Sequence, residues 1–132
     1  MPSWTNKSCT LSYNKETPYI TIQWHGYATS LQFREVHEKL VSLMLETNIY
    51  KVLADNTYLP QVDSIDEKWI SDNWLPRAIK AGYSALSVLT SRTQSSKVVV
   101  DYMLSNRDKN VLTIECFDNI NKARQWIIDF KK

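Results

Sequence analysis

Hydrophobic and polar positions alternate with a period of two near the start of the chain. Residues 9–13 and 19–25 both alternate in this way, and the second run places Ile20, Ile22 and Trp24 on one face. Such alternation is typical of half-buried β-strands. Because the connection between the two runs is short and polar, we predict that the strands form a hairpin.

The period changes after Gly26, where apolar positions recur three and four residues apart. Thr29 and Gln32 have the spacing of a capping box that starts a helix, and Asn48 is suited to the left-handed conformation that ends one. The apolar stripe consists of Phe33, Val36, His37, Leu40, Leu43 and Met44. This stripe predicts an amphipathic helix.

A strand and a second helix are predicted next. Residues 52–54, Val-Leu-Ala, form an apolar run without alternation, as expected of a central strand covered on both faces. Ser64 and Glu67 form a second capping box. Pro76 lacks a backbone N–H, so we expect this helix to kink or restart within the three residues before it. Gly82 is expected to end the helix.

The remaining pattern predicts two strands, at residues 84–90 and 111–117, and two helices, at residues 94–106 and after a cap at Asp118 or Asn119. Three consecutive valines weaken the helix at 94–106, because β-branched residues suit strands better. The order is ββαβαβαβα. We therefore predict one α/β domain over residues 1–132, with a mixed, mostly parallel sheet, an N-terminal hairpin and four flanking helices.

Composition narrows the class of protein. The chain is 43% hydrophobic with a net charge of +2, which favours a packed core and gives no basic surface for nucleic acid. No apolar run approaches the length of a membrane span, and the first residues lack a signal peptide, so we expect a cytoplasmic protein. Cys9 and Cys116 have no metal or redox spacing, and only two glycines are present. We expect no metal and no cofactor.

Candidate binding residues gather in one segment. Asp55 and Asn56 follow the central strand, where open α/β sheets place ligands; the alternative is that Asp55 caps its loop through backbone hydrogen bonds. Trp69, Trp74 and Arg77 can form an apolar pocket with an anion-binding group, or an interface hot spot. The alternative is that the indoles pack on the sheet while Arg77 stacks on one of them.

The two histidines are weaker candidates. His37 lies on the apolar stripe, where a core histidine is the commoner case. His25 lies at a strand end and can reach a cleft there. Neither has a second ligand at metal-binding spacing, and catalysis requires a base next to a nucleophile, which the sequence alone does not place.

Several segments carry a family resemblance: residues 19–28, the helix from Phe33, residues 52–56, residues 74–78 (Trp-Leu-Pro-Arg-Ala), and Phe117-Asp118 leading to Ala123 and Trp126. Together they resemble the SpoIIAA-like superfamily, which joins STAS domains with the SEC14-like lipid-binding fold, and in particular small bacterial members with a Trp-Leu-Pro-Arg motif. STAS regulators are phosphorylated on the first serine of an Asp-Ser-Ser-Gly turn. Here that turn reads Asp55-Asn56-Thr57-Tyr58: asparagine follows the aspartate, the glycine is missing, and Thr57 is the only hydroxyl in place of the two serines. The resemblance therefore implies Thr57 as the phosphorylation site.

Three functions follow as hypotheses. The first is a non-enzymatic regulatory or protein-interaction module that binds a protein partner, or a second copy of itself, through an exposed apolar patch around Trp74 and Arg77. The second is a carrier of a small apolar or lipid-like ligand, which requires a cavity lined by aromatic residues. The third is an enzyme, which requires His25 or Asp55 to meet a polar partner in a cleft.

Overall fold

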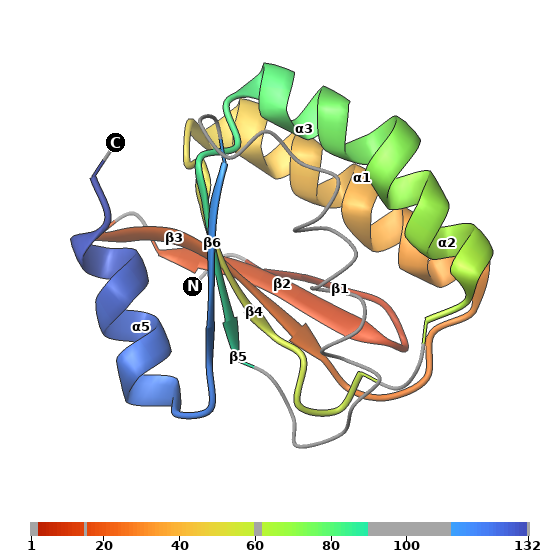
Figure 1. The fold of residues 1–132 in the computed structure, drawn as a ribbon, viewed down its shortest axis with the longest axis horizontal. Coiled ribbons are helices and arrows are strands. Elements are labelled where there is room, and N and C mark those ends of the chain that lie inside the picture. Colours follow the sequence, from red (N-terminus) through yellow and green to blue (C-terminus); the bar gives the residue numbers. More distant parts are fainter. Residues whose placement is uncertain (1–2, 15, 60–61, 90–111, 132) are drawn as a thin grey trace.

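A six-stranded mixed sheet forms the centre of the molecule, with the strands in chain order (Figure 1). The structure is a computed structural model that describes residues 3–14, 16–59, 62–89 and 112–131. The strands are β1 (Ser3–Thr5), β2 (Cys9–Asn14), β3 (Thr17–Trp24), β4 (Lys51–Asp55), β5 (Ala85–Leu89) and β6 (Thr113–Phe117).

The strand directions confirm the predicted hairpin and the mixed sheet. β1, β2 and β3 pair antiparallel, and β3, β4, β5 and β6 pair parallel. Strand β1 was not predicted. Its three residues are too few to establish a period, and it is ordered by pairing with β2.

Helices cover both faces of the sheet. One face carries α1 (Ser30–Thr47) beside a continuous helical run made of α2 (Ser64–Trp69), a π-helical turn η1 (Ile70–Trp74) and α3 (Leu75–Ala81). The other face carries α5 (Ile120–Asp129), as Figure 1 shows. The α/β class is therefore confirmed. The helix expected at residues 94–106 lies outside the described residues.

Helix α1 begins and ends as its sequence predicts. The Thr29 Oγ1 accepts the backbone N–H of Gln32 at 3.2 Å, and the Gln32 Oε1 accepts the backbone N–H of Thr29 at 3.0 Å. Asn48 has φ 59°, the left-handed conformation. The whole predicted stripe is buried.

The predicted restart before Pro76 takes the form of a π-helical turn. The backbone N–H of Leu75 bonds to the carbonyl of Ile70, five residues back, and α3 then starts at Leu75 with Pro76 in its first turn. Pro76 has no N–H, and its ring would clash with a carbonyl of a regular α-helix, so the π-helical turn interrupts the regular hydrogen-bond pattern just before it. Gly82 ends α3 with φ 120°, and the Tyr50 ring lies 2.9 Å from where a Cβ would stand.

The start of α2 differs from the prediction by one residue. Asp63, and not Ser64, is the N-cap: its Oδ1 accepts the backbone N–H of Ile65 at 3.0 Å, and Ser64 is the first helical residue. The Ser-x-x-Glu spacing predicted a cap at Ser64, but the carboxylate one residue earlier accepts the hydrogen bond.

The core has two parts because the sheet is covered on both faces. Along β4, Val52 and Ala54 belong to the large cluster under α1, η1 and α3, while Leu53 belongs to the small cluster under α5. On β5, Ser87 donates a hydrogen bond to the carbonyl of Ala123 at 2.9 Å. This hydrogen bond joins β5 to α5.

Candidate functional site

Trp74 lies in the core, where it is 1% exposed. Its Nε1–H donates to the backbone carbonyl of His37 at 2.6 Å, and its ring stands edge-on to His37 and Tyr83, with centroids 4.9 and 5.8 Å away. The expected exposed patch around Trp74 is therefore wrong. The π-helical turn directs Trp74, together with Ile70, toward the sheet.

Trp69 and Trp74 both face His37, although five residues separate them. The i to i+5 bonding of η1 allows this, because the wider turn brings positions five apart nearer to the same face of the helix than in a regular α-helix. Trp69 is half-buried, with its centroid 6.4 Å from that of His37. Arg34 is the guanidinium that stacks on the indole, at 5.1 Å from the ring centroid. The expectation that Arg77 stacks there is not met.

Arg77 points away from the two indoles and is exposed. It forms a bidentate pair with Glu38 on α1, with N–O distances of 2.6 and 3.2 Å, and its Nη2 also donates to Asn73 Oδ1 at 2.9 Å. The hydrogen bonds that Arg77 donates to Glu38 raise the pKa of Arg77. Arg77 thus ties α3 to α1 and forms no surface with Trp74.

Asp55 and Asn56 lie at the carboxyl end of β4, as predicted. Asp55 Oδ1 accepts the backbone N–H of Thr57 at 3.0 Å, which confirms the interpretation of Asp55 as a loop cap. Asn56 is buried, and its backbone N–H donates to the carbonyl of Leu89 at 2.9 Å. Phosphorylation of the half-buried Thr57 stays a prediction.

Asn56 and Trp74 come together in a small cavity of about 40 Å³ between the sheet, α1 and η1. We call it the aromatic cavity. Its other cyclic side chains are Trp24, Phe33, His37 and Tyr83, and aliphatic residues complete the lining.

His37 lines this cavity as a neutral imidazole. Its Nδ1–H donates to the backbone carbonyl of Phe33 at 2.8 Å, a bond that assigns the proton to Nδ1. Burial lowers the pKa of His37 to about 4. The interpretation of His37 as a core histidine with a satisfied hydrogen bond is confirmed.

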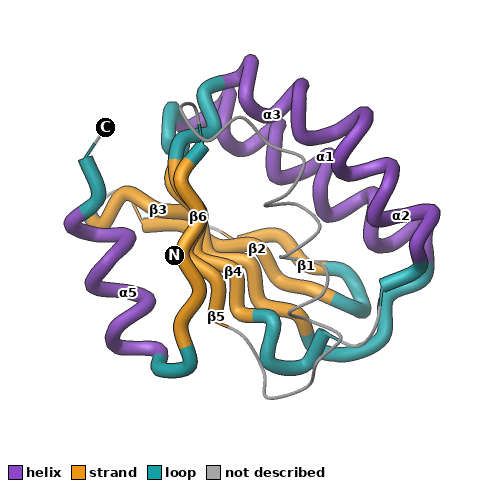
Figure 2. The backbone as a smooth tube through the Cα atoms, in the orientation of Figure 1, coloured by secondary structure: helices purple, strands orange, loops and turns teal. Residues whose placement is uncertain are grey.

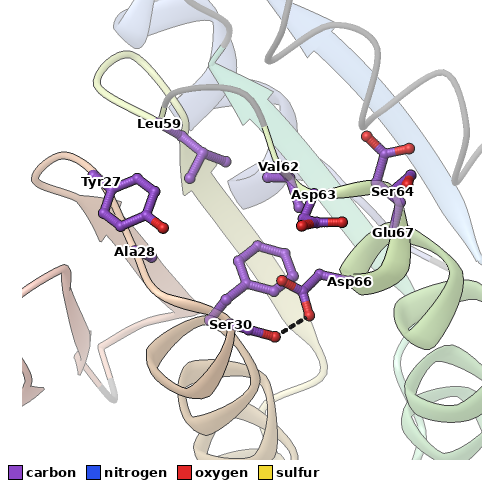
Figure 3. Close-up of a pocket in the computed structure, with 10 residues that line it drawn as sticks. Tyr27, Ala28, Ser30, Leu59, Val62, Asp63, Ser64, Asp66 and Glu67 are labelled. Carbon is purple, nitrogen blue, oxygen red and sulfur yellow. Dashed lines mark hydrogen bonds between the residues drawn. The ribbon is translucent and has the colours of Figure 1, made fainter.

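A much larger pocket, of about 660 Å³, opens at the carboxyl edge of the parallel strands. Figure 2 shows that the loops after β3 and β4 lie at this same edge, next to the starts of α1 and α2. We call this the carboxyl-edge pocket. Its lining residues, drawn in Figure 3, are Tyr27, Ala28, Ser30, Phe33, Leu59, Val62, Asp63, Ser64, Asp66 and Glu67. Phe33 and Leu59 also line the aromatic cavity, so the two hollows are adjacent.

The lining of the carboxyl-edge pocket is acidic. Asp66 is 4% exposed, and its Oδ1 accepts hydrogen bonds from Ser30 Oγ at 2.6 Å and from Arg34 Nε at 3.1 Å. Glu67 is half-buried, and burial together with the charge of Asp63 raises its pKa. A carboxylate that is destabilised by burial and by a neighbouring negative charge, as Glu67 is, marks a site where a positive charge is favourable.

Exposed apolar side chains lie on the same segments as the lining of this pocket. Of the seven large hydrophobic residues that are exposed in the described part of the chain, four lie on the segments that line the pocket. These four, which we call the apolar rim, are Tyr27, Leu31, Tyr58 and Ile65, each between 66% and 81% exposed. Sequence reasoning missed this group. The available signal was an apolar residue off the buried stripe of its helix, as at Leu31, or in a loop after a strand, as at Tyr27.

The side chain of His25 has one polar partner among the described residues, the hydroxyl of Thr10, with 2.7 Å between Nε2 and Oγ1. The pair is exposed on the β2–β3 hairpin, and neither residue lines the two hollows described above. Within the described residues no group of three His, Cys, Asp or Glu side chains is placed to hold a metal ion. None of the helices in the same residues is long and apolar enough to cross a membrane.

Comparison with known proteins does not assign the chain to a family. No family model matches the chain, and no curated protein matches it significantly.

Proposed function

We propose that the protein is a non-enzymatic regulatory or protein-interaction module that binds its partner at the carboxyl edge of the sheet. The observation that carries this proposal is that the apolar rim lies on the segments that line the 660 Å³ pocket, with Tyr27 itself in the lining. Exposed apolar side chains that gather beside a hollow are typical of interaction sites. Aromatic residues such as Tyr27 and Tyr58 are common hot spots in interfaces.

The surface first expected, around Trp74 and Arg77, is a poorer candidate. The Trp74 indole is buried and hydrogen-bonded within the core, and Arg77 already has a carboxylate partner on α1. A partner protein would find neither an apolar anchor nor an unpaired guanidinium there. The carboxyl edge offers both exposed apolar area and a concave surface.

The resemblance to the SpoIIAA-like superfamily belongs to the same proposal. It is supported by four parallel strands, β3 to β6, that lie side by side in chain order, with helical segments after β3, β4 and β6. A cytoplasmic location also fits, because both cysteines are thiols and not a disulfide.

Selection from a library of random peptides displayed on phage tests the proposed surface. The bait is the whole protein, and the counter-bait is the Tyr27→Ser/Ile65→Ser variant, which removes apolar area from exposed positions and leaves the core intact. We expect peptides that bind the wild type and lose at least about tenfold in affinity for the variant. Recovered peptides that bind both proteins equally, or the absence of any specific peptide, would contradict the proposal.

A second candidate function, carriage of a small apolar ligand, is favoured by the aromatic cavity. Its volume of about 40 Å³ holds only a few atoms, since a single water needs about 10–15 Å³ on this measure. A larger ligand has to displace Phe33 and Leu59, which separate the cavity from the pocket above it. A lipid-sized ligand therefore requires a rearranged core.

Native mass spectrometry of the protein purified from its own host separates these functions. Added mass that is lost on denaturation supports the carrier, whereas a bare polypeptide counts against it. Added mass equal to a phosphate that survives denaturation and maps to Thr57 supports the phosphorylation implied by the family resemblance. An unmodified Thr57 counts against that switch.

A further inference from the structure

We propose that the carboxyl-edge pocket receives a lysine or arginine side chain of a partner protein, presented between apolar residues that pack on the apolar rim. This inference rests on the proposed function, because it assigns the chemistry of the partner at that same surface. It is carried by the charge of the pocket, by one carboxylate oxygen that is left without a donor and by the apolar walls.

The charge of the pocket is negative. Three of its lining residues, Asp63, Asp66 and Glu67, are carboxylates, and none of the described lining residues is a cation. Arg34 pairs with Asp66 from outside the lining, at 3.1 Å. Two carboxylates are then left without an ion pair among the described residues, so a cationic partner is complementary to the site.

Asp66 supplies an acceptor atom to the pocket. Both of its side-chain hydrogen bonds, from Ser30 and Arg34, end on Oδ1, and its Oδ2 receives no donor within the part of the chain that the structure describes. An ammonium or guanidinium N–H that enters the pocket can donate a charge-assisted hydrogen bond to this oxygen.

The apolar walls suit the stem of a long cationic side chain. Tyr27 stands on one side of the pocket and the carboxylates of Asp63 and Asp66 on the other, with Leu59 and Val62 above them in Figure 3. Lysine and arginine bury their methylene groups against apolar surface while the charged end keeps polar contacts. The exposed ring of Tyr27 can also stack with the cation.

The same charge argues against two other classes of partner. Anionic membrane surfaces and nucleic acids both require basic patches on the protein, whereas this pocket is lined by acids. A protein segment in which a basic residue stands between apolar residues satisfies both the pocket and the rim.

The composition of selected peptides gives the first test. We expect peptides recovered on the wild-type protein to be enriched in lysine or arginine flanked by apolar residues. For the strongest binder, replacing its basic residue with norleucine should weaken binding at least about tenfold. Raising the salt concentration from about 50 to about 500 mM should weaken it several-fold, since exposed charges are screened. Equal affinity of the norleucine peptide overturns the inference.

Charge variants of the protein give the second test. Asp63→Asn/Glu67→Gln removes two charges from the pocket, and asparagine still caps α2. Binding of the basic peptide should weaken at least about tenfold, while the norleucine peptide is unaffected. The matched control is Glu46→Gln, at the other end of α1, which should change affinity by less than about twofold. If Glu46→Gln weakens binding of the basic peptide as much as Asp63→Asn/Glu67→Gln does, the inference is overturned.

The two proposals fail in different ways. If Tyr27→Ser/Ile65→Ser abolishes peptide binding but the basic residue does not matter, the interaction surface stands and the cationic partner is wrong. If the rim variant has no effect, the proposed function itself is wrong. Sedimentation of the protein with phosphatidylserine vesicles tests whether the partner is an anionic membrane. Vesicle binding that is lost in the rim variant assigns the surface to membranes and overturns the inference.

Discussion

Aromatic and aliphatic side chains gather in two regions of this molecule, and the regions differ in what surrounds them. In the aromatic cavity, Trp74 and His37 are buried and hydrogen-bonded to backbone carbonyls. In the apolar rim, Tyr27 and Ile65 are exposed beside a pocket of carboxylates. The first region uses apolar area to stabilise the fold, and the second leaves it accessible to a partner. Substitutions should separate these two roles.

The largest effect is expected for Trp74→Ala. Removing a buried indole should lower the free energy of unfolding by about 3–5 kcal/mol. Urea denaturation followed by circular dichroism measures this. Trp74→Phe keeps an aromatic ring but removes the Nε1–H bond to His37, so it should cost less, about 1–3 kcal/mol. A Trp74→Ala protein as stable as the wild type would contradict the burial of this side chain.

Acid should destabilise the buried region through His37. Burial lowers its pKa from 6.5 to about 4 in the fold, so the unfolded chain binds the proton more readily. Stability is therefore lost as the pH falls from about 6.5 to about 4, by up to about 1.4 kcal/mol per pH unit. Urea denaturation at several pH values should show a shallower slope for His37→Gln. Equal slopes would contradict a neutral His37.

Rim substitutions should have small effects on stability. Tyr27→Ser, Tyr58→Ser and Ile65→Ser each change an exposed residue, so each should alter the free energy of unfolding by less than about 0.5 kcal/mol. The same variants should weaken the selected peptide. A rim variant that loses stability as Trp74→Ala does would mean that this residue is part of the core.

The two cysteines allow a comparison of chemical reactivity in the native protein that requires no substitution. Cys9 is buried, and burial raises its pKa to about 12, whereas Cys116 is exposed. Because the thiolate is the reactive form, iodoacetamide should modify Cys116 in the native protein and Cys9 only after unfolding. Mass spectrometry of the digested protein identifies the modified residue. Early modification of Cys9 would contradict its place in the core.

Local signals predicted the helix ends well. The predicted capping box forms between Thr29 and Gln32, and Asn48 has the left-handed conformation that ends the helix. These features were predictable because capping depends on a few neighbouring atoms. The break before Pro76 followed from the missing N–H of proline. The type of that break, a π-helical turn, was not predictable, since it depends on how Trp74 packs under His37.

The solvent exposure of individual side chains was the property that the sequence predicted least well. Trp69, Trp74 and Ile65 were assigned to one predicted helix, yet one is half-buried, one is in the core and one is on the surface. The direction of each side chain depends on the π-helical turn and on the packing of the helix against α1. The carboxyl-edge pocket was missed for a related reason, because its lining comes from two loops and two helix starts that are distant in the sequence.

Mapping amide chemical shifts on binding of the strongest selected peptide tests the central claim most directly. We predict changes concentrated at residues 26–31, 57–59 and 62–67, which carry the rim and the pocket. Arg77→Ala should leave that pattern unchanged. Changes centred on residues 73–77 and Glu38, with the carboxyl edge unaffected, would contradict the claim and restore the Arg77 surface as the binding site.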